Sequence, residues 1–444
     1  MSLANKSFSV LLRDVLLLGT NVLTSVVIAR NLGPHMLGLW VVLNLIPSYA
    51  ETLGRLKADA GAIYFLGSGL HAVGDVVFAL NVIAVVSGVV IVLPVLIGFD
   101  WFSQALFGAD VAVVHDYIYV MVLQVPVNFL YMNYVYLHIQ REDVRSLNIM
   151  VMTRALLAST LIVLGLLGFG LGLTAVVFGQ FIGVTLSVVI GVGRYGFPAR
   201  GPGAFRAPVY QDLLRYGGKL YIGNAVSYLN TYSSQAIVVA FCAPAQVAFF
   251  SIAQQVGQLV SKVTEAMGNF LFSRIAKTPD VSESSGLAAR AFRVSLVVLV
   301  PGVIGAAVLM KPALLLLYGT RYLEVLPPFL IIVPGLTLLA AASTLSMFFQ
   351  GIGRADLVAK IAFLPFLLQL TVGLLLVQQL EIVGAAFGFL LALLATAILQ
   401  IVVFVKLTGL PARQLWPGRE DVATVIDFIR RLLRLDGASA RMHE

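Results

Sequence analysis

Charge is scarce in this 444-residue sequence, because only 11% of its residues are Asp, Glu, Lys or Arg. An ordinary soluble domain carries about 25% of charged residues. Hydrophobic residues make up 59% of the chain, so most of its surface must face lipid rather than water. The shortage of charge therefore excludes an ordinary soluble domain and predicts an integral membrane protein.

Cysteine is nearly missing, and histidine is never clustered. Cys242 is the single cysteine, which excludes a disulfide framework and any metal site built from several cysteines. The five histidines are scattered, with no two at the spacing of metal ligands. We therefore expect neither a metal nor a cofactor. No cleavable signal is expected, since the first apolar run is too long and no small-residue cleavage site follows it.

Long apolar runs are abundant. A helix that crosses a bilayer core of about 30 Å needs roughly 20 apolar residues. Such runs are too long and too continuous for the strands of a membrane barrel. The sequence predicts an all-α membrane protein with twelve transmembrane helices, near residues 8–30, 37–56, 75–98, 113–138, 147–168, 171–193, 215–240, 245–273, 288–310, 325–349, 357–378 and 383–406.

The basic residues predict the orientation of these spans. If the N-terminus is cytoplasmic, 24 of the 29 Lys and Arg residues fall in inside segments. Only Arg30, Lys311 and Arg321 fall outside, while Arg154 and Lys262 lie within spans. Because cytoplasmic loops are enriched in Lys and Arg, both termini are predicted to be cytoplasmic. The outer turns near 169–172, 241–244 and 379–382 are too short for an extracytoplasmic domain.

The two halves of the sequence resemble each other at an offset of about 210 residues. Leu106-Phe107-Gly108 recurs as Leu317-Tyr318-Gly319, and Val125-Pro126 recurs as Val333-Pro334. These matches predict two six-helix repeats, 1–197 and 213–408, around a central cavity. The proline- and glycine-rich segment 198–212 is the predicted cytoplasmic linker. Repeats of this kind are the usual construction of alternating-access transporters, with the site at the repeat interface.

The tail, 409–444, turns polar. Its apolar residues follow helical spacing while its arginines lie elsewhere on the helix, which predicts an amphipathic helix on the cytoplasmic leaflet. A plain cytoplasmic helix or a partner-docking helix is the alternative.

Several spans carry a polar stripe, and polar residues inside a membrane are candidates for a cavity lining. Since successive helical residues turn by about 100°, the members of each stripe share one face. The stripes are Ser251, Gln254, Gln258, Lys262, Glu265 and Asn269 in 245–273; Lys219, Ser227, Asn230 and Ser234 in 215–240; Arg13, Thr20, Asn21, Thr24 and Asn31 in 8–30; and Tyr117, Gln124, Asn128, Tyr131 and His138 in 113–138.

Helix packing is the alternative interpretation of each stripe. Ser, Thr and Asn often serve helix–helix hydrogen bonds alone. Arg13, Lys219 and Arg154 could instead extend their charges to the headgroups. Lys262 and its amide neighbours are more polar groups than helix packing alone requires. Cations outnumber carboxylates in the spans, and Glu265 is expected to pair with Lys262. A cationic lumen suits an anionic substrate such as a phosphate or pyrophosphate group.

Short motifs carry a family resemblance. Residues 28–40, IARNLGPHMLGLW, resemble the first-loop signature of Wzx-type polysaccharide flippases of the MATE-like multidrug/oligosaccharidyl-lipid/polysaccharide superfamily. Residues 213–217 and 249–253 resemble the start of the second half in that family, and residues 316–319 resemble its ninth-to-tenth connection. Arg13-Asp14 is similar to a pair in the related peptidoglycan-precursor flippases, whose two extra C-terminal spans are missing here.

The resemblance implies a flippase that moves an undecaprenyl-diphosphate-linked oligosaccharide (an O-antigen, capsule or exopolysaccharide unit) to the outer leaflet of the bacterial cytoplasmic membrane. Arg13, Lys219, Lys262 and Arg154 would attract the diphosphate. Gln254, Gln258, Asn230, Asn128 and Gln124 would bind sugar, with Asn21, Thr24, Ser227, Ser251, Glu265 and Asn269 lining the lumen. Implied partners are membrane lipid, a glycan polymerase and glycosyltransferases, and no nucleic acid. The family's acidic residue late in span seven is missing around Ser233-Ser234-Gln235, so its ion-coupling role does not carry over.

Two other functions stay open. A MATE-like cation-coupled drug exporter would want a membrane-buried carboxylate, for which Glu265 is the candidate. A membrane enzyme of glycan assembly, such as a polymerase or ligase, would need catalytic residues on a sizeable outer loop. The short outer loops argue against the enzyme.

Overall fold

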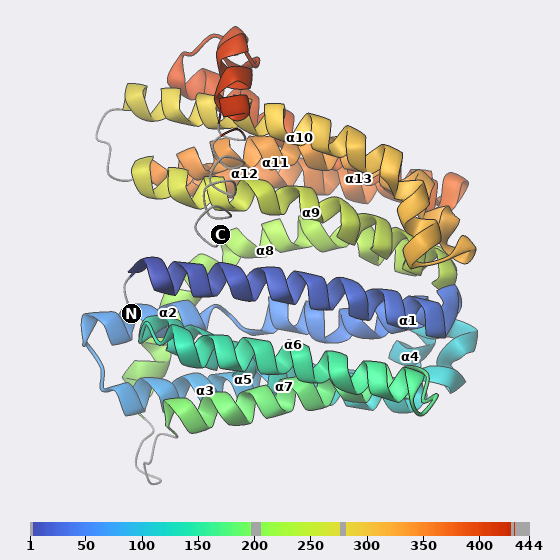
Figure 1. The fold of residues 1–444 in the computed structure, drawn as a ribbon. Coiled ribbons are helices and arrows are strands. Elements are labelled where there is room, and N and C mark those ends of the chain that lie inside the picture. The colour runs from blue at the N-terminus through green and yellow to red at the C-terminus, as the bar shows by residue number, and fades with distance from the viewer. Residues whose placement is uncertain (1–2, 197–205, 276–280, 428–429, 431–444) are drawn as a thin grey trace, which may run out of the picture. The chain divides into compact units, whose positions relative to one another are not determined.

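The computed structural model of the chain describes residues 3–196, 206–275, 281–427 and 430 (Figure 1). It divides into two compact units, which are described separately. The first unit comprises Met1–Tyr228 with Ala243–Ala248, and the second comprises Leu229–Cys242 with Phe249–Glu444. Over the described residues both units are built from helices and turns, so the predicted all-α class is confirmed. The predicted boundaries of halves, linker and tail stay predictions.

The helices of the first unit are α1 Leu3–Gly54, α2 Ala58–Ser68, α3 Val73–Ile97, α4 Phe99–Phe107, α5 Val111–Gln140, α6 Val144–Leu167, α7 Leu173–Tyr195 and the beginning of α8 Ala207–Phe241. The second unit contains the end of α8, most of α9 Pro244–Ile275, and α10 Val281–Leu317, α11 Leu326–Gly351, α12 Ala355–Leu368 and α13 Leu374–Thr408. Helices suit a lipid environment because each satisfies its own backbone hydrogen bonds.

Eight segments of the described residues are long and apolar enough to cross a membrane. Two of them, Leu12–Gly54 and Asp356–Thr408, are long enough for two spans each. Each contains one kink, at Gly33 (φ 73°) and at Glu381 (φ 50°), where we expected a turn between spans. Continuous helix on both sides of a single residue therefore replaces the loop expected near residues 31–36. The count of twelve spans stays a prediction.

Two other predicted turns are confirmed in position, while their outer side stays a prediction. Helix α6 ends at Leu167 and α7 begins at Leu173, while α8 ends at Phe241 and α9 begins at Pro244. Two short helices, α2 and α4, were not predicted, because neither is long enough to appear as a span. The π-helical turn at Gln369–Gly373 between α12 and α13 was not predicted either.

The internal repeat recurs as structure. In the first unit Gly108 has a positive φ of 50° and begins a 3₁₀ turn, after which α5 carries Pro126. In the second unit Gly319 has a φ of 89°, the 3₁₀ turn Thr320–Val325 follows it, and α11 carries Pro334. Glycine suits both positions because it adopts a positive φ without a steric cost. The sequence offset thus corresponds to one repeated turn-and-helix unit.

Small residues bring α6 and α7 close together. A Cβ atom added at Gly183 of α7 would lie 2.8 Å from both the Ala158 Cβ and the Arg154 carbonyl oxygen of α6. One added at Gly179 would lie 2.7 Å from Ile162 Cγ1. Spacing of small residues by four positions is a common way for membrane helices to approach backbone to backbone. Close packing against α7 therefore fixes the segment of α6 that carries Arg154.

Candidate functional site

Arg13 of α1 is held against α6 inside the first unit. Its guanidinium forms an ion pair with Asp14 at 2.8 Å and donates a hydrogen bond from Nη1 to Asn148 Oδ1 at 3.0 Å. Asn148 in turn donates from Nδ2 to Ser9 Oγ at 2.8 Å. The pairing of Arg13 with Asp14 was expected from the sequence, whereas the contact with Asn148 depends on the tertiary fold. Arg13 thus lies in a fixed polar network that joins α1 and α6.

Arg154 lies two helical turns further along α6, above the ring of Tyr131 of α5. Its Cζ atom is 4.4 Å from the ring centroid, which is a cation–π distance. Tyr131 is 5% exposed, and the charges of Arg154, Glu51 and Arg13 all act on it. The fold therefore places Arg154 of α6 over a buried tyrosine of α5, while Arg13 of α1 contacts the same helix α6 at Asn148.

The N-terminus of α6 is fixed by a side-chain cap from the turn that precedes it. The Asp143 carboxylate caps the helix by accepting a hydrogen bond from the Ser146 N–H at 3.1 Å. Hydrogen bonds from the Ser146 side chain and N–H hold the pKa of Asp143 below its usual range, and nearby His138 and Arg194 lower it further. This cap fixes the start of the helix on which Asn148 and Arg154 are spaced.

Gln124 and Asn128 precede Tyr131 on the same face of α5. Both side chains are buried, and neither Gln124 Oε1 nor Asn128 Oδ1 has a hydrogen-bond partner. A buried acceptor without a donor is costly, so native structures rarely keep one without a reason. A hydroxyl-rich ligand would supply the donors that these amides lack.

A charged cluster at the end of α1 was missed by the sequence analysis as a candidate site. Arg55 forms ion pairs with Glu51 at 3.3 Å and with Asp59, and its Cζ lies 5.4 Å from the Tyr136 ring centroid. Asp59 is 2% exposed. The i, i+4 spacing of Glu51, Arg55 and Asp59 was the available signal. Arg55 is among the 24 basic residues that the sequence assigns to inside segments, so it was not predicted as a site residue.

The stripe of α9 divides into two parts in the second unit. Ser251 and Gln254 are buried, and Gln254 Nε2 donates to Ser234 Oγ of α8 at 3.3 Å. Gln258 and Lys262, one and two turns further on, have exposed side chains. Charged and amide groups at membrane depth avoid lipid, so this second part is suited to a water-filled lumen.

The structure describes only some of the remaining predicted site residues, and it places those differently. Thr24 is buried and bonds back to the Thr20 carbonyl oxygen at 2.8 Å, as a packing role requires, while Asn21 is exposed. The side chains of Lys219, Ser227, Asn230, Glu265 and Asn269 lie outside those that the structure describes. Within the described ranges, no three His, Cys, Asp or Glu side chains come together as a metal site.

The long apolar helices define a class of protein, the multi-pass membrane proteins. The chain belongs to the family described as polysaccharide biosynthesis protein, whose pattern matches residues 27–327, more than half of the sequence. No curated protein sequence matches the chain.

Solved structures with the same fold are distant in sequence. A lipid II flippase MurJ in an inward closed conformation has a TM-score of 0.75 at 12% identity, over 97% of this chain and 93% of its own. An inward-facing multidrug resistance MATE family transporter of the MOP superfamily has a TM-score of 0.73 at 15% identity, over 88% and 94%. The Vibrio cholerae MATE transporter VcmN has a TM-score of 0.58 at 14% identity, over 91% and 95%. The predicted MATE-like fold is thereby confirmed.

Proposed function

We propose that this protein is a flippase that moves an undecaprenyl-diphosphate-linked oligosaccharide from the cytoplasmic to the outer leaflet of the bacterial cytoplasmic membrane. The observation that carries the proposal is Arg154 held over Tyr131, on the face of α5 that carries the buried, unsatisfied amide oxygens of Gln124 and Asn128. Arg13 is held against the same helix that carries Arg154, through Asn148. Membership of a polysaccharide biosynthesis family and the fold shared with a lipid II flippase support it.

The chemistry of the polar face fits the two parts of such a substrate. Guanidinium groups bind phosphate oxygens through paired, charge-assisted hydrogen bonds, so Arg154 and Arg13 suit the diphosphate. Amide groups exchange hydrogen bonds with sugar hydroxyls, so Gln124 and Asn128 suit the glycan. In the second unit Gln258 and Lys262 repeat this pairing of amide and cation. The polyprenyl chain would remain in lipid while the two halves alternate in access.

Reconstitution tests the proposal directly. Proteoliposomes containing the protein should flip a fluorescent undecaprenyl-diphosphate-linked glycan, scored by accessibility to an impermeant quencher. The same lipid with a single phosphate should be flipped more slowly, because it carries less charge for the arginines to bind. Equal rates with and without the protein would refute the proposed function.

We expect Lys262→Ala to impair surface glycan display without lowering the amount of protein in the membrane. The exposed ammonium of Lys262 would lose its attraction for the diphosphate, and removal of an exposed side chain leaves packing unchanged. Lys360→Ala is the matched control, since Lys360 is an exposed lysine paired with Asp356 at 2.9 Å. Normal display in Lys262→Ala would remove Lys262 from the substrate path.

We expect Asn128→Leu to reduce flipping while leaving the thermal stability unchanged or higher. The change removes a buried acceptor without a partner, and replacing such a group with an apolar side chain of similar shape costs little. The melting temperature and the flipping rate are measured on the same preparation. A lower melting temperature with normal flipping would assign Asn128 to packing.

A cation-coupled drug exporter is the second candidate, favoured by the fold shared with multidrug MATE transporters. Expression in a sensitive host should then give resistance to ethidium or norfloxacin that depends on Glu265. The flippase proposal predicts no such resistance. Glycan polymerase and glycosyltransferase partners belong to the flippase proposal and would co-purify with the protein.

A further inference from the structure

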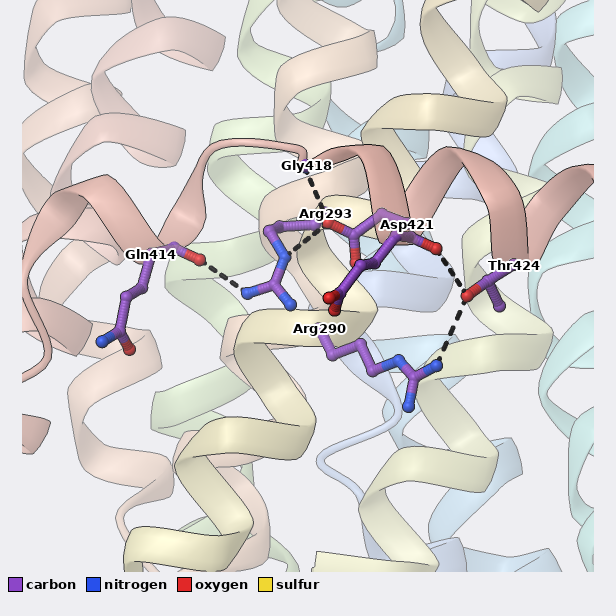
Figure 2. Close-up of polar contacts among 7 residues, drawn as sticks. Arg290, Arg293, Gln414, Gly418, Asp421 and Thr424 are labelled. Atoms are coloured by element: carbon purple, nitrogen blue, oxygen red, sulfur yellow. Dashed lines mark hydrogen bonds and ion pairs between the residues drawn. The ribbon is translucent and has the colours of Figure 1, made fainter.

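Beyond Thr408, where α13 ends, the chain continues as a strap of residues 409–427 that runs across one end of α10 (Figures 1 and 2). The basic residues of the sequence assign this end of α10 to the cytoplasmic side. A 3₁₀ turn, Ala412–Leu415, begins the strap, and a helix follows from Arg419. Leu415 is 5% exposed and belongs to the buried cluster that contains Ala289 and Phe292 of α10. The strap is therefore packed onto the second unit.

An ion pair clamps the strap to α10. Arg293 Nε donates to Asp421 Oδ2 at 2.8 Å, and Arg293 Nη1 donates to the Gln414 carbonyl oxygen at 2.6 Å (Figure 2). Asp421 Oδ2 also accepts the Gly418 N–H at 2.9 Å, in the manner of a capping box. Asp421 is only 4% exposed. Such a buried charge pair fixes both the position and the rotation of the strap helix.

The clamp lies just before the part of α10 that exposes apolar side chains. Val298, Ile304 and Val308 of α10 have exposed apolar side chains, as a helix facing lipid requires. Arg293 precedes Val298 by five residues, which is about 7.5 Å along a helix. The strap thus crosses α10 at the depth of the lipid headgroups.

The residues that the strap leaves uncovered suit that depth. Trp416 is 77% exposed, and Val422 and Ile426 are also exposed. Tryptophan is enriched at membrane–water interfaces, where its ring lies among the headgroups. Arg413 and Arg419 are exposed on the same strap, as are Glu420 and Asp427. The two arginines can approach anionic headgroups, which attract basic side chains near the surface.

We propose that the strap is a membrane-interface anchor of the second unit, held on α10 by Arg293 and Asp421, with Trp416, Val422 and Ile426 in the anionic cytoplasmic leaflet. Helix α13 ends at Thr408, eight residues before Trp416, so lipid is the surface that this side chain would meet first. This inference is independent of the substrate.

Tryptophan fluorescence tests the anchor in the full-length protein. Trp40→Phe and Trp101→Phe leave Trp416 as the single tryptophan, and the protein is placed in nanodiscs whose lipids carry bromine near the headgroup. Loss of Trp416 fluorescence to the brominated lipid is expected, with protection from aqueous iodide. Quenching by iodide alone would place Trp416 in water. Protection from both quenchers would place it under a protein partner or a second copy, and either result overturns the proposal.

A second measurement tests the anchor without the two tryptophan substitutions, in case the variant that carries them does not fold. A nitroxide on Val422→Cys, in a Cys242→Ser background, should collide more often with oxygen than with a water-soluble nickel complex. The reverse would overturn the anchor. Nanodiscs with and without phosphatidylglycerol separate the charge contribution, because equal quenching in both would remove the anionic preference.

The clamp itself has a matched pair of variants and a pH dependence. Asp421→Asn should increase iodide quenching of Trp416, while Asp427→Asn, an exposed acid on the same helix, should not. Burial raises the pKa of Asp421, but the Gly418 N–H and the Arg293 guanidinium outweigh it and hold that pKa below its usual range. The clamp is therefore intact above the ordinary carboxyl pKa of about 4 and is lost as the pH falls through the lowered value. Unchanged quenching in Asp421→Asn would refute the clamp.

Discussion

Arg154→Ala is expected to reduce flipping of the lipid-linked glycan by roughly ten- to a hundredfold, with normal amounts of protein in the membrane. A hydrogen bond to a charged group contributes about 1.5–3 kcal/mol, and each 1.4 kcal/mol is about tenfold in a rate or binding constant. Arg154 is positioned over the buried Tyr131 ring at 4.4 Å, so its N–H donors are held at the polar face of α5 and α6. The loss is measured as the initial rate of flipping in proteoliposomes.

Two further variants distinguish the contribution of the Arg154 charge from that of its donor geometry, and both from a general loss of structure. Arg154→Lys keeps the charge but loses the planar pair of donors, so an intermediate rate is expected. Arg145→Ala removes an exposed arginine from the first turn of the same helix, and the rate should stay near that of the wild type. A normal rate in Arg154→Ala would exclude Arg154 from substrate binding and leave its contact with Tyr131 as packing.

Gly183→Ala is expected to destabilise the protein by about 1–3 kcal/mol, the usual cost of overfilling a packed interface. The new Cβ would lie 2.8 Å from the Ala158 Cβ and 2.8 Å from the Arg154 carbonyl oxygen. The oxygen belongs to the backbone, so α6 and α7 would have to separate. Because Arg154 is carried by the displaced segment, flipping should fall together with the melting temperature in detergent.

The control is a glycine-to-alanine substitution elsewhere on α7. Gly193 lies on α7 with nothing within 4 Å of an added Cβ, and its backbone is helical. Alanine is favoured over glycine in a helix by about 1 kcal/mol, so Gly193→Ala should keep or raise the melting temperature. Equal melting temperatures for the two variants would show that α6 and α7 do not pack at Gly183.

Some of the candidate site could be predicted from the sequence. The pairing of Arg13 with Asp14 follows from adjacency, and the shared face of Gln124, Asn128 and Tyr131 follows from helical spacing. The contact between Arg154 and Tyr131 could not be predicted, because it joins two separate helices. The sequence of neither helix shows how it is rotated toward the other. The cluster around Arg55 was missed for a similar reason. The helix is interrupted at residues 56–57, where Leu56 and Lys57 have positive φ, and this tight turn buries the charge of Arg55, which the sequence places in an apparent loop.

The sequence by itself determined the membrane environment, the helical class and the repeat of Gly108 and Pro126 as Gly319 and Pro334. The membrane environment and the helical class follow from the free-energy cost of exposing apolar groups to water and backbone polar groups to lipid, which composition reveals. The repeat follows from the positive φ that glycine adopts at fixed spacing. Tertiary structure alone decided which polar residues meet: Arg154 with Tyr131, Gln254 with Ser234, and Arg293 with Asp421. Each of these contacts joins segments from different helices or from the strap, so it depends on how closely the segments approach and how each is rotated. The scarcity of charge in the sequence predicts the membrane, whereas the packing of the helices decides where the few charges lie.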